Sequence, residues 1–186
     1  PHLGLLTVAN IIRHDCEVTI ENENIRPIDF DDVPDLVGIA VTVDVLPRAI
    51  EIASIYRQKG VKVIAGGIHI TTASSSVPKD AFDSLCIGFA ENTWPQIIED
   101  MKHNRLQSEY VSKPLTSGND IVAPAYDMID KTDYLWYNVV STSRSCPHKC
   151  DFCYNSSGTH QYINRNIDDV LADIKSLGTK HIMFID

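Results

Sequence analysis

The chain has 186 residues, 44% of them hydrophobic, which is enough to bury a substantial core in one domain or in one domain with part of a second. Its 16 Lys and Arg against 25 Asp and Glu give a net charge of −9 without a basic cluster, which argues against a nucleic-acid surface or an anionic-membrane patch. No apolar run approaches the ~20 residues of a membrane span and no signal segment opens the chain, so we expect a cytoplasmic protein.

The residues up to 104 alternate between helix and strand patterns. Apolar residues at helical spacing predict helices, and short runs rich in Val, Ile and Leu predict strands. The predicted helices cover residues 3–12, 44–59 and 93–102, and the predicted strands cover residues 18–20, 36–41, 61–65 and 84–87. This alternation is typical of an α/β fold with a doubly wound parallel sheet.

Three loops of the predicted sheet follow the ends of its strands, at residues 40–44, 66–72 and 88–92. Ligands of such sheets bind beyond the carboxyl ends of the strands, so these are candidate binding loops. The pair Gly66-Gly67 could let the backbone approach a ligand closely, or it could simply allow a tight turn. The residues alone leave both readings open.

The composition changes after residue 104. Residues 105–133 are rich in Ser, Pro, Thr, Gly, Asn and Asp and predict an ordered linker. We then expect a strand over residues 136–142, a cysteine loop, a helix from residue 167 that stops at Gly178, and a strand over residues 181–185. Two strands and one helix cannot close a barrel, and no strand precedes the first helix, so we expect a fragment of a longer fold.

Three thiols in the cysteine loop have the spacing of metal ligands. Cys146, Cys150 and Cys153 follow the pattern CxxxCxxC. Cysteine thiolates hold iron–sulfur clusters, and a cubane needs four ligands, so three cysteines leave one iron open for chemistry. The sequence therefore predicts these three residues as metal ligands.

A zinc site is the alternative. The three thiols with His148 could form a tetrahedral Cys3His site, although His148 lies between two of the cysteines, an awkward place for closing a tetrahedron. A disulfide with one leftover thiol is less favoured, because nothing marks the chain as secreted. Cys16 and Cys86 lie in apolar surroundings and are predicted to be core residues.

Residues 143–154 (SRSCPHKCDFCY) resemble the signature of the radical S-adenosylmethionine superfamily. The resemblance implies a [4Fe–4S] cluster on Cys146, Cys150 and Cys153, with S-adenosyl-L-methionine chelating the fourth iron. It implies reductive cleavage to a 5′-deoxyadenosyl radical, an external electron donor, and Phe152 packed near the adenine. The segment after the linker would then begin a radical S-adenosylmethionine partial (β/α) barrel.

The first part of the chain resembles the cobalamin-binding domain that precedes this barrel in one subgroup of the superfamily. The resemblance rests on residues 3–6 (LGLL), 34–39 (PDLVGI), 65–71 (AGGIHIT) and 87–94 (IGFAENTW). It implies a flavodoxin-like fold with cobalamin across the strand ends. The implied cofactor contacts are Thr42, Gly66, Gly67, His69, Thr71, Gly88 and Glu91.

Together, the two resemblances imply the N-terminal part of a cobalamin-dependent radical S-adenosylmethionine enzyme, similar to anaerobic magnesium-protoporphyrin IX monomethyl ester oxidative cyclases and radical methylases. The expected domains are residues 1–104 and 134–186, joined by the linker 105–133. The expected reaction is radical methylation or oxidative cyclisation of a small-molecule substrate, with this fragment inactive alone. The alternative is a non-catalytic module that binds a corrinoid or zinc.

Overall fold

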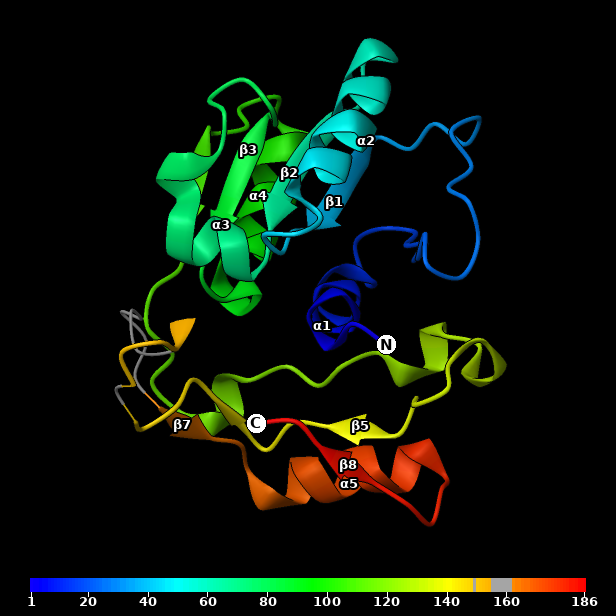
Figure 1. The fold of residues 1–186 in the computed structure, drawn as a ribbon, viewed down its shortest axis with the longest axis vertical. Coiled ribbons are helices and arrows are strands. Elements are labelled where there is room, and N and C mark those ends of the chain that lie inside the picture. Colours follow the sequence, from blue (N-terminus) through cyan, green and yellow to red (C-terminus); the bar gives the residue numbers. More distant parts are fainter. Residues whose placement is uncertain (149, 155–161) are drawn as a thin grey trace. The chain divides into compact units, whose positions relative to one another are not determined.

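The computed structural model describes residues 1–148, 150–154 and 162–186 (Figure 1). These residues form two compact units, which are described separately below. One comprises Glu21–Lys113, and the other joins Pro1–Ile20 to Pro114–Asp186. No helix of the described residues is both long enough and apolar enough to cross a membrane.

The unit Glu21–Lys113 is built on a parallel sheet. Its strands lie in the order β1-β2-β3-β4 and span Leu36–Ala40, Lys62–Gly66, Ser84–Ile87 and Glu109–Val111. Each neighbouring pair is parallel. Val63, Ile64 and Ala65 in β2 are completely buried, as expected for a strand covered on both faces. The predicted α/β fold with a parallel sheet is therefore confirmed.

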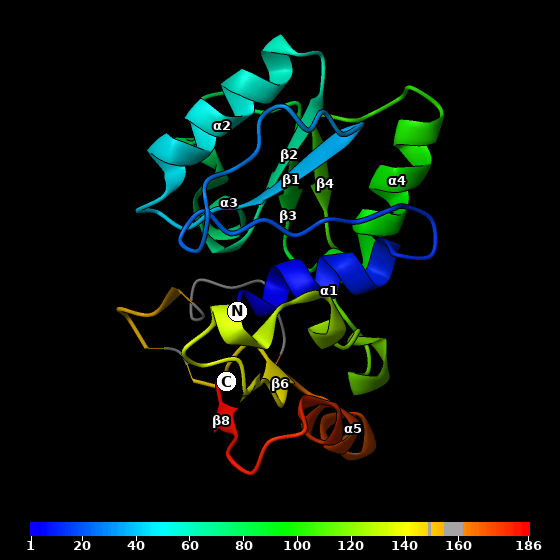
Figure 2. The same ribbon diagram turned by 90° about the vertical axis from the view of Figure 1, so that its right-hand side faces the viewer.

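Helices connect the consecutive strands of this sheet. They are α2 (Leu46–Gln58), α3 (Ile68–Ala73) and α4 (Trp94–Lys102). Both α2 and α4 carry a proline in the first turn, where the missing N–H leaves no helical bond unmade. Figure 2 shows α2 and α4 on opposite sides of the strands.

The two faces of the sheet are packed by different side chains. On one face, α2 and α3 contribute Ile52, Tyr56 and Ile70 to a core that also contains Val63. On the other, Trp94 of α4 lies against β1 at a glycine: a β-carbon at Gly38 would lie 2.7 Å from the ring carbon Cη2 of Trp94. A glycine in the strand therefore lets the indole approach the sheet.

In its described residues, the other unit contains α1 (Leu3–Ile12), α5 (Ile167–Leu177) and four short strands. β5 (Val139–Val140) pairs in parallel with β8 (Met183–Phe184), and β6 (Ser143–Arg144) pairs antiparallel with β7 (Ile163–Asn164). The single-turn helices η3 (Gly118–Asp120), η4 (Tyr126–Met128) and η5 (Lys131–Asp133) lie between β4 and β5 in the chain. The core is formed by Leu6, Tyr126, Val140, Val170 and Leu177.

The first helix packs with the C-terminal part of the chain. The Leu6 carbonyl oxygen accepts a hydrogen bond from the Ala125 amide at 3.0 Å, and the Asn10 side chain donates to the Ala123 carbonyl at 2.9 Å. The compact units thus group residues differently from the expected ranges 1–104, 105–133 and 134–186. Those ranges divide the chain by motif, and as functional boundaries they stay a prediction.

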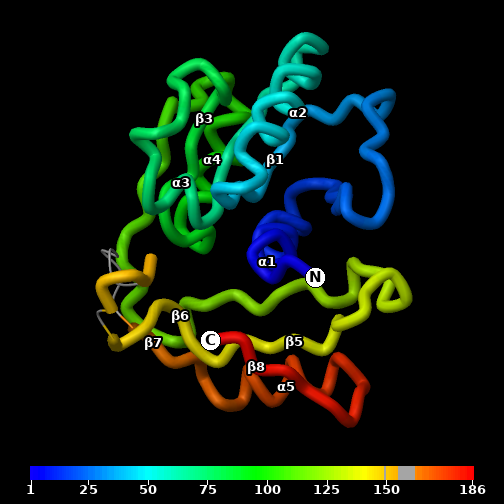
Figure 3. Tube along the Cα trace, viewed as in Figure 1, coloured from blue at the N-terminus to red at the C-terminus, as the bar shows by residue number. Residues whose placement is uncertain are grey.

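Several predicted elements differ from the observed ones. Residues 18–20 form no strand, and the predicted strands 136–142 and 181–185 shorten to two residues each. The predicted linker contains β4, and the predicted loop 66–72 contains most of α3. The long irregular segments that follow α1 and β4 can be traced in Figure 3.

Candidate functional site

The loops at the carboxyl ends of β1, β2 and β3 are joined by hydrogen bonds. The Val41 amide donates to the Gly66 carbonyl at 2.8 Å, and the His69 amide donates to the Val41 carbonyl at 3.1 Å. The Gly88 amide donates to the Thr71 hydroxyl oxygen at 3.0 Å. The structure therefore brings the three predicted binding loops together at one edge of the sheet, where parallel sheets bind their ligands.

Gly67 has a backbone conformation that side chains rarely adopt. Its φ is +100°, and a β-carbon there would lie 2.9 Å from the amide nitrogen and 3.0 Å from the carbonyl oxygen of Val41. By contrast, a β-carbon on Gly66 would make an ordinary contact with the Cys86 β-carbon at 3.5 Å. The close approach that Gly67 permits is to the chain's own backbone, which favours the tight-turn reading of the glycine pair.

The polar side chains of these loops already have partners within the chain. The Thr42 hydroxyl donates to Asp44 Oδ1 at 2.5 Å, and this hydrogen bond lowers the pKa of the Asp44 carboxyl. His69 Nε2 lies 3.2 Å from the Ser76 hydroxyl oxygen. The predicted roles of Thr42 and His69, with those of Gly66, Gly67, Thr71, Gly88 and Glu91, as cofactor contacts stay predictions.

A buried thiol lies on β3, one of the strands that end at these loops. Cys86 on β3 is 3% exposed, and its sulfur lies 3.1 Å from the hydroxyl oxygen of Thr93. Burial raises the pKa of the Cys86 thiol, which keeps it protonated. Cys86 is thus a core residue, as predicted.

The predicted thiol ligands are Cys146 and Cys153, which are partly buried, and Cys150, which is exposed. The Cys153 amide donates to the Cys150 carbonyl at 3.0 Å, so the two close a turn. Phe152 is 94% exposed. Among residues 1–148, 150–154 and 162–186, no three His, Cys, Asp or Glu side chains form a group that could hold a metal ion. The ligand roles of the three cysteines therefore stay a prediction.

A second polar cluster lies at the carboxyl ends of β5 and β8. The Asp186 carboxylate accepts the amide hydrogens of Thr142 at 2.6 Å and Ser143 at 2.9 Å, and the Thr142 hydroxyl hydrogen at 2.7 Å. Burial opposes ionisation of Asp186, but these hydrogen bonds together lower its pKa. The carboxylate thereby ties the end of β8 to the corner that follows β5.

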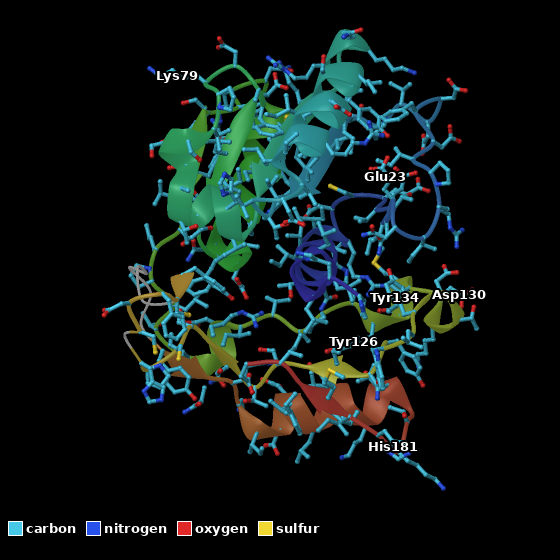
Figure 4. The ribbon with its side chains drawn as sticks, viewed as in Figure 1. Glu23, Lys79, Tyr126, Asp130, Tyr134 and His181 are labelled. Carbon is cyan, nitrogen blue, oxygen red and sulfur yellow. The ribbon has the colours of Figure 1, made fainter. Side chains whose placement is uncertain are left out.

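A buried ion pair lies beside this cluster. Nη1 of Arg165 donates to the Ser141 carbonyl at 2.9 Å and to Asp173 Oδ2 at 2.7 Å. Tyr126, labelled in Figure 4, donates its hydroxyl hydrogen to the Val139 carbonyl at 2.9 Å. Burial and the nearby charge of Asp173 raise the pKa of Tyr126 to about 12, so the phenol stays neutral.

Sequence reasoning did not find the Arg165–Asp173 pair, although a signal existed. Asp173 shares the buried face of the predicted helix with Val170 and Leu177. A carboxylate at a core position requires a partner, because burying an unpaired charge is costly. Arg165, shortly before the helix, is the cation that supplies it.

Comparisons with known proteins find methyltransferases. No known family profile matches the chain. Bacteriochlorophyllide d C-8(2)-methyltransferase of Chlorobaculum tepidum is 31% identical over 163 residues, which cover 84% of this chain and 36% of that protein. An uncharacterised methyltransferase of Pyrococcus horikoshii is 25% identical over an alignment that covers the whole chain and 48% of the relative. One of Synechocystis is 27% identical over 82% of this chain and 29% of its own length.

The chain thus spans between about a third and a half of the length of these curated relatives. Their names correct the expected family: all three are methyltransferases, and none is named as a cyclase, a cobalamin protein or a radical enzyme. The assignment to cobalamin-dependent radical S-adenosylmethionine enzymes is therefore withdrawn. The predicted cleavage of S-adenosylmethionine by a [4Fe–4S] cluster, the predicted cobalamin and the predicted oxidative cyclisation are withdrawn with it. The physical reason is that thiol spacing identifies possible ligands but does not determine what they hold.

Proposed function

We propose that the chain belongs to an enzyme that transfers a methyl group from S-adenosylmethionine to a small-molecule substrate. The observation that carries this proposal is the set of three relatives, each aligned over at least 82% of the chain and each named as a methyltransferase. One relative is named for its action on bacteriochlorophyllide d, so we take that compound as the first acceptor to test.

The parallel sheet supports a binding role for the unit Glu21–Lys113. Open α/β sheets bind nucleotide-containing ligands beyond the carboxyl ends of their strands. S-adenosylmethionine contains a nucleoside, and the loops after β1, β2 and β3 converge on such an edge. We infer that this edge of the sheet serves the methyl donor rather than a corrinoid.

The test of this proposal is equilibrium binding of S-adenosylmethionine and S-adenosylhomocysteine to the protein, measured by calorimetry. The proposal expects both to bind with one site per chain. Failure of both to bind the full-length protein, with bacteriochlorophyllide d present or absent, would contradict it.

Thr71→Val should weaken this binding while the protein stays folded. The substitution removes the oxygen that accepts the Gly88 amide, which loosens the contact between the loops after β2 and β3. Leaving the Gly88 amide without its acceptor costs about 1–3 kcal/mol where the bound state needs the two loops in contact. We therefore expect the affinity to fall about tenfold. Thr72→Val is the matched control, because the Thr72 hydroxyl donates to the Ile68 carbonyl within its own helix. Equal affinities for the two variants would contradict the role of the loop contact.

The three thiols with the spacing CxxxCxxC are proposed as metal ligands, and the metal is left for measurement. Cys146→Ala, Cys150→Ala and Cys153→Ala should each lower the metal content of anaerobically purified protein, whereas Cys16→Ala and Cys86→Ala should not. Elemental analysis checks the prediction. It fails if Cys150→Ala retains the metal content of the parent protein.

A further inference from the structure

The guanidinium of Arg165 is deeply buried but only partly used. The Arg165 side chain is 2% exposed and that of Asp173 is 7% exposed. Nη1 makes both of the hydrogen bonds described above, to Ser141 and Asp173. Among the residues that the structure describes, Nε and Nη2 of Arg165 are buried and have no hydrogen-bond partner.

The unused atoms form one complete edge of the guanidinium. The Nε–H and one Nη2–H point in the same direction and form a fork that matches the two oxygens of a carboxylate. Buried donors without partners carry an energetic cost, and the cost is larger for a charged group. A native protein keeps such a fork in its interior when another group accepts its hydrogen bonds.

The position of the fork suggests that a bound ligand accepts its two hydrogen bonds. Arg165 is held against the corner at Ser141 and Thr142, where its own amide donates to the Thr142 carbonyl at 2.9 Å. This corner follows β5, and Asp186 follows its parallel neighbour β8, so the fork lies at the carboxyl ends of the pair. Ligands of parallel α/β folds bind at this end of the strands.

The charges nearby favour an anion. Asp173 neutralises Arg165 through Nη1 only, and the Asp186 carboxylate is satisfied by the amides of Thr142 and Ser143. Nη1 of a second cation, Arg144, lies 3.5 Å from the Ser141 hydroxyl oxygen. The nearby carboxylates are thus matched by donors of the chain, and within its described part the Arg165 fork is the group left for an incoming anion.

We propose that Arg165 binds the carboxylate of a small-molecule ligand through Nε and Nη2, at the carboxyl ends of β5 and β8. The carboxylate belongs to a molecule other than the methyl donor, because the proposed donor site is the sheet edge in the unit Glu21–Lys113. The proposal stands on the buried fork and does not depend on the proposed methyl transfer. Because both atoms are covered, entry requires a local opening, and a pair of buried water molecules is the competing way to satisfy the fork.

The test follows the Arg165 Nε–H resonance by NMR in the ¹⁵N-labelled full chain. Sodium acetate, sodium phosphate and sodium chloride are added at equal ionic strength, and the resonance is assigned in the parent protein by through-bond correlation with the rest of the Arg165 side chain and backbone. We expect a saturable shift with acetate and none with chloride. No response to acetate, or the same response to all three salts, would overturn the proposal in favour of water. A stronger response to phosphate would overturn the carboxylate assignment.

A second measurement compares variants by thermal unfolding in acetate. Arg165→Lys keeps a cation beside Asp173 but lacks the fork, so its affinity for acetate should fall at least about tenfold. Arg13→Lys is the control, because Arg13 pairs with Asp127 at the surface and should leave the acetate effect unchanged. Equal stabilisation of both variants would overturn the proposal. If Arg165→Lys fails to fold, the resonance of the parent protein decides. Titration with S-adenosylmethionine separates the fork from the proposed donor site. We expect no shift of the Arg165 resonance when the donor saturates the protein, and a shift that saturates at far lower concentration than with acetate would overturn the separate ligand.

Discussion

Asp173→Ala should destabilise the unit that contains α5 by about 3–5 kcal/mol, because removing one partner of a buried ion pair leaves the other charge unpaired. Asp173 is buried, and its Oδ2 accepts the hydrogen bond from Arg165 Nη1 at 2.7 Å. This loss is a large part of the 5–15 kcal/mol that typically holds a domain folded. Urea unfolding monitored by circular dichroism measures it.

The control for this variant is Asp169→Ala in the same helix. Asp169 is exposed in the first turn of α5, where a carboxylate contributes about 0.3–1 kcal/mol through the helix dipole. A loss in Asp173→Ala no larger than that in Asp169→Ala would show that the buried pair does not stabilise the unit.

Gly67→Ala should also cause a large loss, of about 3 kcal/mol or more in the free energy of unfolding. A backbone conformation open mainly to glycine costs roughly 1–3 kcal/mol when another residue is forced into it. The added β-carbon would in addition lie 2.9 Å from the Val41 amide nitrogen, and backbone cannot move aside as a flexible side chain can.

The neighbouring glycine provides the matched control. A β-carbon on Gly66 would make ordinary contacts with the β-carbon of Cys86 at 3.5 Å and its carbonyl oxygen at 3.7 Å, so Gly66→Ala should cost much less than Gly67→Ala. The comparison is made by denaturant unfolding of the two variants under the same conditions. Equal losses would mean that general packing at the strand end, rather than the conformation of Gly67, controls stability there.

The parts of the fold that could be predicted from the sequence have strong local patterns. The apolar run at 61–65 predicted a strand, and β2 spans Lys62–Gly66. The helix predicted from residue 167 matches α5, and Gly178, which stops it, has a φ of +63°. Periodicity and glycine caps depend on residues close in sequence, which is why they could be read without a structure.

The errors concern features that depend on distant partners. Glu109–Val111 forms β4 because it pairs with β3, and nothing within the segment itself marked it as a strand. Residues 18–20 have a strand-like composition but no pairing partner among the described residues. The place of α1 beside the C-terminal segments likewise depends on Leu6 and Asn10 meeting residues more than a hundred positions away.

The candidate sites show the same difference between features that local sequence predicts and features that depend on distant partners. The strand-end loops were predictable, because the alternation of strand and helix fixes which loops share an edge of the sheet. The Arg165 fork was not, because it depends on which guanidinium atoms remain unpaired after folding. The chemistry of the three thiols was assigned from their spacing, and the names of the relatives corrected it.

The most direct test of the proposed function is transfer of a labelled methyl group. The full-length protein is incubated with S-adenosylmethionine whose methyl group carries deuterium, with the proposed first acceptor and an extract of cellular small molecules, and the products are analysed by mass spectrometry. The account predicts a product that carries the intact labelled methyl group, together with S-adenosylhomocysteine in equal amount. Protein that binds S-adenosylmethionine but transfers the label to no acceptor, or a methylated product without the label, would contradict it.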